Sequence, residues 1–306
     1  MAKFDFDGPT ERVDPDRDRH EIMADIDTLG LHKYITELDV QGYTVLEPGV
    51  AAPVGYVEQL RDEVLRICSE RLTGFDANAG VVRTDRTGVK GAYANLFYLI
   101  FEGKLFEDVV LNRSAMTMVD YLCGRSCQLL SLNAQIKGPG TQVTAIHNDL
   151  SRQPAPLPVY AQMANATWCL TDYNQENGGL AVIPGSHRWC SHPRREDRDP
   201  HTNQNAIPVE APFGSLIVWH SNTWHGAYKK TSPGLRLNLI MYYGRPYLEQ
   251  AEIYWDKVTD EFLERTPARM KTLLNLDARW PIYSDVDIDL RRISPRAGAS
   301  GRSQYS

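Results

Sequence analysis

Apolar residues recur at three- and four-residue spacing in residues 25–38 and again in residues 57–71. This spacing is typical of amphipathic helices, and Pro53 stands just ahead of the second run, as at a helix start. Between the two runs, the segment GYTVL at residues 42–46 has the composition of a short strand. The pattern therefore predicts two helices with one strand between them.

The middle of the chain changes from helical to strand-like spacing. Residues 74–91 are rich in glycine and polar residues without a period, which predicts a long loop. Helical spacing returns at 93–112 and 114–124, and β-rich runs follow: CQLLSLNAQIK, TQVTAIH, ATWCLTDY, LAVIPG, GSLIVWH and LRLNLIMYY. Short strands separated by turn residues predict a sandwich or jelly roll.

The ends of the chain frame this β-rich region. Helical spacing reappears from residue 246 to about 276, while residues 1–20 and 291–306 have too little apolar content to order themselves and are predicted to be flexible tails. We expect a single domain over 21–290, mainly β with packed helices. Its core, at about 125–245, is predicted to be a double-stranded β-helix, the jelly roll of cupin-like proteins.

The composition of the chain limits the classes of binding partner and the cellular location that we expect. The 306 residues are 42% hydrophobic and 24% charged, with a net charge of −6 and no basic stripe, so we expect no nucleic-acid partner. No apolar run is long enough for a membrane span and the N-terminus is too charged for a secretory signal, so we expect a cytoplasmic protein without a membrane partner. The five cysteines form no CxxC pair, which predicts free thiols.

A histidine and an aspartate lie two residues apart at His147 and Asp149, so in a strand both side chains leave the same face. Two histidines and one carboxylate on one face of an octahedron form the facial triad of non-haem iron(II) oxygenases. An isolated HxD pair is a weak signal, because it also occurs by chance at solvated strand ends. The third ligand must come from downstream, where both His220 and His225 follow a β-rich run.

Three motifs in order resemble the phytanoyl-CoA dioxygenase-like family of iron(II)- and 2-oxoglutarate-dependent oxygenases, over about residues 38–245. They are the HxD pair, the segment WCLTDYNQENGGLAVIPGSH at 168–187, and a histidine followed by glycine with an arginine eleven residues later. The resemblance implies Fe(II), 2-oxoglutarate and O2 as cofactors. It selects His225 as the third ligand, since His225 precedes Gly226 and lies eleven residues before Arg236, and it leaves His220 structural.

The resemblance also implies a cosubstrate site. Arg236 is expected to bind the distal carboxylate of 2-oxoglutarate, because a guanidinium forms two parallel hydrogen bonds with a carboxylate. Trp168 resembles the family tryptophan that lines this pocket, and Asn133 and Gln135 are candidates for the iron-side carboxylate. Many relatives carry a hydroxyl residue two positions after the distal histidine. Here that position is Ala227, and Thr223 is the candidate replacement.

The function implied by the resemblance is oxidation, usually hydroxylation, of a C–H bond while 2-oxoglutarate is decarboxylated to succinate. We expect a small, largely apolar metabolite as substrate, and leave a homodimer open. Two other readings remain: a non-catalytic metal-binding jelly roll that acts as sensor or scaffold, and a zinc hydrolase, for which no general base is placed by a motif.

The mouth of the substrate pocket is predicted from two irregular segments. Residues 74–91 contain several glycines, and the proline-rich residues 151–159 begin two positions after Asp149. Long irregular segments in compact domains often form functional lids. We therefore expect Tyr160, Arg83 and Lys90 to contact the substrate.

Overall fold

The computed structural model describes residues 15–85 and 90–276. At its N-terminal side, helices α1 (Pro15–Leu29) and α2 (His32–Gln41) precede strand β1 (Tyr43–Leu46) and helix α3 (Val54–Arg71). Gly42 ends α2 with a φ of 82°, a left-handed conformation that glycine adopts without strain. The strand and the helix predicted at 57–71 are confirmed, whereas the single helix predicted at 25–38 is interrupted at residues 30 and 31, between α1 and α2. Residues 15–20 belong to α1, however, so the predicted flexible tail is wrong for them, and the rest of that tail lies outside the described residues.

The segment before the β-rich region differs from its prediction. The expected loop at 74–91 contains a small hairpin, β2 (Arg83–Thr84) with β3 (Lys90–Gly91). The expected helix at 93–112 opens as strand β4 (Tyr93–Leu96), which pairs with β5, so long-range pairing overrides the helical spacing. The 3₁₀ turn η1 (Leu99–Phe101), helix α4 (Lys104–Val110) and helix α5 (Arg113–Cys123) follow.

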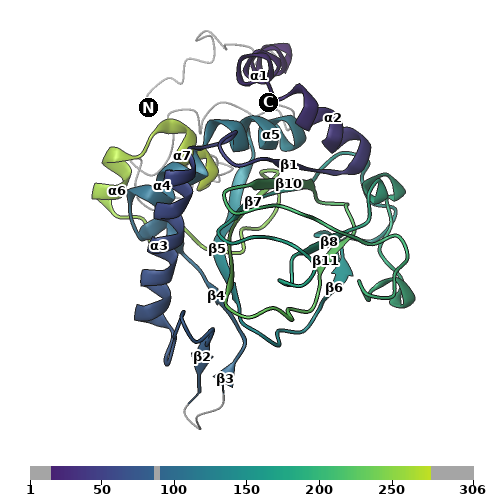
Figure 1. The fold of residues 1–306 in the computed structure, drawn as a ribbon. Helices are drawn as coiled ribbons and strands as arrows, with labels where there is room; N and C mark the ends of the chain where they lie inside the picture. The colour runs from purple at the N-terminus through teal and green to yellow at the C-terminus, as the bar shows by residue number, and fades with distance from the viewer. Residues whose placement is uncertain (1–14, 86–89, 277–306) are drawn as a thin grey trace.

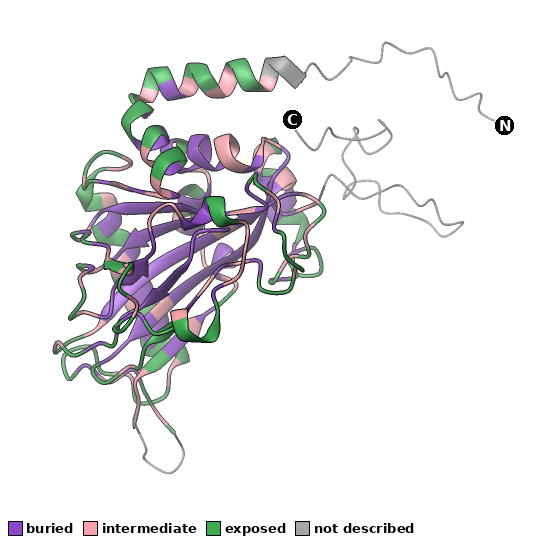
Figure 2. Cartoon of the chain, turned by 90° about the vertical axis from the view of Figure 1, so that its right-hand side faces the viewer, coloured by how far each residue is buried: buried purple, intermediate pink, exposed green. Residues whose placement is uncertain are grey.

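The larger of the two main sheets is antiparallel, with strand order β1-β10-β7-β12-β5-β4. Its long strands match the predicted runs: β5 (Gln128–Lys137), β7 (Met163–Cys169), β10 (Leu216–His220) and β12 (Arg236–Gly244). Helices α3 to α5 cover one face of this sheet (Figure 1). The buried positions run through its strands, whereas α1 and the loops are largely exposed (Figure 2).

The smaller sheet lies on the other side of the larger one (Figure 1) and has the order β6-β11-β8-β9. Its strands are β6 (Thr144–His147), β8 (Leu180–Val182), β9 (Ile207–Pro208) and β11 (His225–Ala227). The fold is thus mainly β with packed helices and belongs to the jelly-roll class, as predicted. Between β12 and residue 276, where the described residues end, helix forms only at α6 (Asp260–Arg265) and α7 (Ala268–Leu273), so the predicted helical segment 246–276 is shorter than expected.

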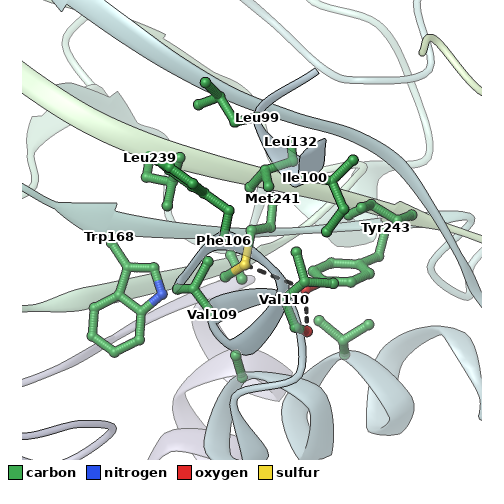
Figure 3. Close-up of a cluster of buried hydrophobic side chains, with 14 of the residues drawn as sticks. Leu99, Ile100, Phe106, Val109, Val110, Leu132, Trp168, Leu239, Met241 and Tyr243 are labelled. Carbon is green, nitrogen blue, oxygen red and sulfur yellow. Dashed lines mark hydrogen bonds between the residues drawn. The ribbon is translucent and has the colours of Figure 1, made fainter. Parts of the chain in front are cut away.

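The two faces of β12 serve different purposes. Leu237, Leu239 and Met241 belong to the core beneath the helices. Figure 3 shows Leu239 and Met241 there together with Phe106 and Trp168. The alternating positions, beginning with Arg236, point to the opposite face, toward the smaller sheet. None of the helices within residues 15–85 and 90–276 is both long and apolar enough to cross a bilayer.

Candidate metal centre

The predicted metal ligands come together at the edge of the smaller sheet. His147 ends β6 and His225 begins β11, and the two residues are cross-strand partners whose ring centroids are 4.4 Å apart. Asp149 follows β6, with its Oδ1 3.6 Å from Nε2 of His225. One ligand atom from each residue lies within 4.8 Å of the other two. Ligands about 2.1 Å from one ion lie about 3 Å apart on an octahedral face, so small rotations complete the site.

Backbone contacts prepare both histidines to bind a metal. Nδ1 of His147 lies 2.8 Å from the carbonyl oxygen of Ala145, and Nδ1 of His225 lies 2.9 Å from that of Thr223. A carbonyl only accepts, so each Nδ1 donates and each Nε2 keeps its lone pair. Burial lowers the pKa of His225 in spite of the neighbouring Asp149 carboxylate. The neutral imidazole is the form that coordinates metals.

The third ligand is also held in place. The backbone N–H of Asp149 donates to the carbonyl of Ser221 at 3.0 Å. Oδ2 of Asp149 accepts a hydrogen bond of 2.7 Å from Nδ2 of Asn165, which lies on β7 of the larger sheet. These contacts leave Oδ1 facing His225, so Asn165 orients the carboxylate for the ion.

Gly226 is required by the close approach of β11 to β6. A Cβ atom at this position would lie 2.5 Å from the carbonyl oxygen of Thr144 and 3.1 Å from the backbone nitrogen of Ile146. Both atoms belong to β6, the strand that carries His147. The glycine therefore sets the distance between the two histidine ligands.

We expect Gly226→Ala to weaken metal binding at least about tenfold, although all three ligands remain, because the methyl group pushes β6 away from β11. A calorimetric titration with nickel(II) measures this. Gly55→Ala is the matched control: it lies in α3, where an added Cβ meets nothing closer than 4.0 Å. Unchanged nickel affinity in Gly226→Ala would show that the strand spacing does not control the site.

The ENGGLAVIPGSH motif holds β8 and β11 together. Gly178 has a φ of +67°, and a Cβ on Gly179 would lie 2.7 Å from the carbonyl oxygen of Asn174, so both glycines are needed in this turn. At the other end of the motif, Oγ of Ser186 accepts a hydrogen bond of 2.8 Å from the backbone N–H of Trp224. Trp224 directly precedes His225, so the motif positions a ligand without binding the metal itself.

The other two histidines of this region pack against each other. The rings of His187 and His220 have centroids 5.4 Å apart, and Nδ1 of His220 accepts from the backbone N–H of Asn222 at 3.0 Å. Burial, with the nearby His187, lowers the pKa of His220 to about 3. Among the described residues, the cluster suited to a metal includes neither histidine. Both are therefore structural in this geometry, as the resemblance implied for His220.

Arg236 faces the space between the sheets, where the described part of the chain offers it no carboxylate partner. It is 2% exposed, its Nη1 donates to Oη of Tyr173 at 2.5 Å, and its Nε has no hydrogen bond. No aspartate or glutamate within residues 15–85 and 90–276 forms an ion pair with it. A buried cation without a counter-ion is unfavourable, so this site fits an anionic ligand.

Further unpaired polar atoms support a polar ligand on this face. Buried atoms without a hydrogen-bond partner include Oδ1 of Asn165, Oγ1 of Thr167, Nε1 of Trp219 and Oδ1 of Asn238. The strand registers place all four on the Arg236 face of the larger sheet. The residues present therefore fit a metal ion at the triad and a carboxylate ligand that extends toward Arg236.

The structure corrects two of the predicted cosubstrate residues. Trp168 pairs with Leu239 and lies on the helix-facing side of β7, opposite to Arg236, so it does not line the site (Figure 3). Oγ1 of Thr223 donates its hydrogen to the carbonyl of Gly42 at 2.8 Å, so it cannot replace the hydroxyl missing at Ala227. Tyr173 instead brings a hydroxyl to Arg236, and burial raises the pKa of that hydroxyl, which keeps its hydrogen available.

Asn133 and Gln135 do lie on the Arg236 face, where they are the partners of Ile240 and Asn238. Nδ2 of Asn133 donates to Oγ of Ser131 at 3.0 Å. Their contact with the iron-side carboxylate stays a prediction.

Three residues of this face were not singled out from the sequence: Asn165, Tyr173 and Lys137. Alternation in β5 could have indicated Lys137, because it continues the series of Asn133 and Gln135. Asn165 and Tyr173 have no such signal, since their roles depend on contacts with Asp149 and Arg236 from other strands.

The predicted substrate residues remain untested. Tyr160 is 45% exposed, with its ring over the guanidinium of Arg245. Arg83 is exposed on β2. On β3, the backbone of Lys90 pairs with Thr84, and the Lys90 side chain lies outside the described residues. The segment 151–159 is anchored beside the site, since Nδ2 of Asn222 donates to the carbonyl of Pro158 at 2.8 Å.

Comparison with known proteins places these observations in a family. The chain is 31% identical over 188 residues to dioxygenase af480 of Aspergillus fumigatus. The aligned region covers 60% of this chain and 59% of that protein. HygX of Streptomyces hygroscopicus, solved with nickel and 2-oxoglutarate, has a TM-score of 0.58 at 17% identity, covering 72% of this chain and 88% of its own. The epimerase SnoN from nogalamycin biosynthesis gives a TM-score of 0.52 at 20% identity, covering 71% and 83%.

The chain spans less than two thirds of the curated relative af480, so the match is to part of that protein. The two solved structures share the fold, with sequence identities too low to carry more. The model of the phytanoyl-CoA dioxygenase family matches residues 38–238, which include the triad and Arg236. The chain therefore belongs to the phytanoyl-CoA dioxygenase family.

Proposed function

We propose that this protein is an iron(II)- and 2-oxoglutarate-dependent dioxygenase that oxidises, usually by hydroxylation, a C–H bond of a small, largely apolar metabolite. The observation that carries the proposal is the triad of His147, Asp149 and His225, in which each histidine keeps the lone pair of Nε2, opposite a buried Arg236 that has no counter-ion among the described residues. A relative named as a dioxygenase and a fold shared with an enzyme that binds 2-oxoglutarate support it.

The chain's own residues define what happens at this site. Nε2 of His147, Nε2 of His225 and a carboxylate oxygen of Asp149 would hold the iron and leave its other face open. When bound, iron(II) with 2-oxoglutarate and O2 supplies the oxidising chemistry and converts the cosubstrate to succinate and carbon dioxide. Arg236 and the Tyr173 hydroxyl would fix the distal carboxylate, and Asn165 keeps Asp149 oriented.

Burial of the site contributes by excluding water. The side chains of His225 and Asp149 are 6% and 7% exposed, and Trp219 packs 5.2 Å from the His225 ring, centroid to centroid. Burial, and then the Asp149 charge, raise the pKa of Tyr242, so its hydroxyl stays protonated on the site face. A dry, preorganised site strengthens every electrostatic contact to the ligand.

The substrate class is proposed from the relatives and from the rim of the site. HygX has been solved with hygromycin B bound, and SnoN belongs to nogalamycin biosynthesis, so both are linked to small natural products. Val159 and Tyr160, which directly follow the anchored Pro158, are exposed at 78% and 45% and offer an apolar rim. A homodimer and a cytoplasmic location stay predictions.

The test of the substrate class is the stimulation of succinate formation by candidate molecules. Apolar natural products should accelerate it and gain one oxygen atom, detected by mass spectrometry, whereas acyl-CoA thioesters should not. If only acyl-CoA thioesters are oxidised, the substrate proposal is wrong while the cosubstrate chemistry stands.

A further inference from the structure

A second buried basic residue lies directly beside Arg236. Lys137 is the last residue of β5, and its cross-strand partners are Arg236 on β12 and Tyr93 on β4. Cross-strand partners point to the same face of a sheet, so Lys137 faces the smaller sheet together with Arg236. Lys137 is 2% exposed, as is Arg236. The interior thus carries two adjacent basic side chains.

The described surroundings of Lys137 provide neither a counter-ion nor a hydrogen-bond acceptor for its side chain. Within residues 15–85 and 90–276, its side chain takes part in no hydrogen bond or ion pair. Lys230, the other deeply buried lysine of this region, differs: its Nζ donates to Oδ1 of Asn177, to the carbonyls of Ser232 and Pro233, and to Oγ of Ser232, at 2.6 to 3.2 Å. Lys230 is therefore structural, whereas Lys137 is left without a partner in the described part of the chain.

The charged form of Lys137 is unfavourable in this position unless an anion binds beside it. Burial, and then the charge of Arg236, lower the pKa of Lys137 to about 6. The groups that face it are Arg236 from β12 and Tyr93 from β4, with Tyr173 bound to Arg236, and none of these is an acid that is ionised at neutral pH. Near pH 8 the lysine is accordingly neutral in the protein without cosubstrate.

We propose that Lys137 binds the distal carboxylate of 2-oxoglutarate together with Arg236 and takes up a proton as the cosubstrate binds. This inference rests on the proposed function, because it assigns a second cation to the same cosubstrate. The carboxylate brings the negative charge that both side chains lack, and it restores the charged form of the lysine. Lys137 thereby supplies a donor in a site where Ala227 has no hydroxyl.

The test compares two ligands that differ only in the distal carboxylate. Nickel-loaded wild type and Lys137→Met are titrated by calorimetry with 2-oxoglutarate and with 2-oxopentanoate, which keeps the metal-binding end. Loss of one charge-assisted hydrogen bond should weaken 2-oxoglutarate binding by roughly 10- to 100-fold and leave 2-oxopentanoate binding unchanged. Equal 2-oxoglutarate affinity in both proteins, or equal weakening for both ligands, would overturn the role of Lys137.

The proton is measured by repeating the 2-oxoglutarate titration at pH 8 in buffers of different ionisation enthalpy. Wild type should take up about one proton per cosubstrate bound, since a lysine with a pKa near 6 is almost fully neutral at that pH. Lys137→Met should take up none. Lys137→Arg, which is always charged, should bind 2-oxoglutarate without uptake. The same uptake in all three proteins would place the proton elsewhere and contradict the proposal.

Two controls separate an effect of Lys137 on folding from an effect on cosubstrate binding. The lowered pKa means that the unfolded chain binds more protons than the folded one between pH 6 and 10, so Lys137 destabilises the cosubstrate-free protein, and more so at pH 6 than at pH 9. Lys137→Met should then unfold at a temperature no lower than that of wild type. If nickel-loaded wild type binds no 2-oxoglutarate, the proposed function fails, whereas normal wild-type binding with an unaffected Lys137→Met rejects only the lysine.

Discussion

His225→Ala is expected to lose iron(II) affinity by more than about 100-fold and to show no turnover, because it removes one of three ligands. Changes that only reorient a ligand cost about 10- to 100-fold, so removal of a ligand must exceed that range. His220→Ala should keep both iron and activity. His220 is an equally buried histidine five residues away, but it stacks on His187 and takes no part in the metal cluster.

The pair of variants is measured by iron content after desalting and by calorimetric titration with nickel(II). Both remove a buried imidazole of the same size, so thermal unfolding should show similar losses of stability and leave metal affinity as the difference between them. Iron loss in His220→Ala, with iron retained in His225→Ala, would reverse the ligand assignment.

Arg236→Leu is expected to weaken 2-oxoglutarate binding by at least about 100-fold and to leave metal affinity nearly unchanged. Each charge-assisted hydrogen bond contributes about 1.5–3 kcal/mol, and a guanidinium offers two to one carboxylate. Together they correspond to roughly 100-fold or more in affinity, at 1.4 kcal/mol for each factor of ten. Arg236 lies on β12 of the larger sheet and contacts no ligand of the triad, so the metal should stay.

The measurement is the dissociation constant of 2-oxoglutarate for the nickel-loaded protein. Arg236→Lys is the graded control, because it keeps the charge and loses the planar fork, and its affinity should fall between wild type and Arg236→Leu. An equal loss of nickel and 2-oxoglutarate in Arg236→Leu would mean that the arginine supports the fold of the site and not the cosubstrate.

The pairing of His147 with Asp149 and the face on which Arg236 lies could be predicted because they depend on short-range patterns. The two-residue spacing of His147 and Asp149 is a property of a single strand, and alternation in β12 separates Arg236 from Leu237 without any knowledge of the fold. The choice between His220 and His225 was different: the residues left it open, and the family resemblance decided it.

Trp168 shows why the rest could not be predicted. Alternation divides β7 into two faces, but which face meets the metal depends on its pairing with β12, where Trp168 is opposite Leu239 and Cys169 is opposite Asn238. A buried aromatic residue fits either face. The partner of Asp149 on this strand is Asn165, a polar residue with no distinguishing pattern in the sequence.

The error at 93–112 has the same origin. Tyr93–Leu96 has helical spacing with the residues that follow, but it pairs along β5 at the edge of the larger sheet. Such pairing depends on a strand more than thirty residues away in the chain. Local periodicity therefore identified the strands of the core better than this edge strand.

The most direct measurement is the conversion of 2-oxoglutarate by the purified protein with iron(II) and O2, compared with zinc(II) and with His225→Ala. We expect succinate and carbon dioxide to form in equal amounts, only with iron and O2, and not in the variant. Iron binding without loss of 2-oxoglutarate, over a panel of small-molecule substrates, would indicate a non-catalytic sensor or scaffold. Hydrolysis supported by zinc alone would contradict the account as well.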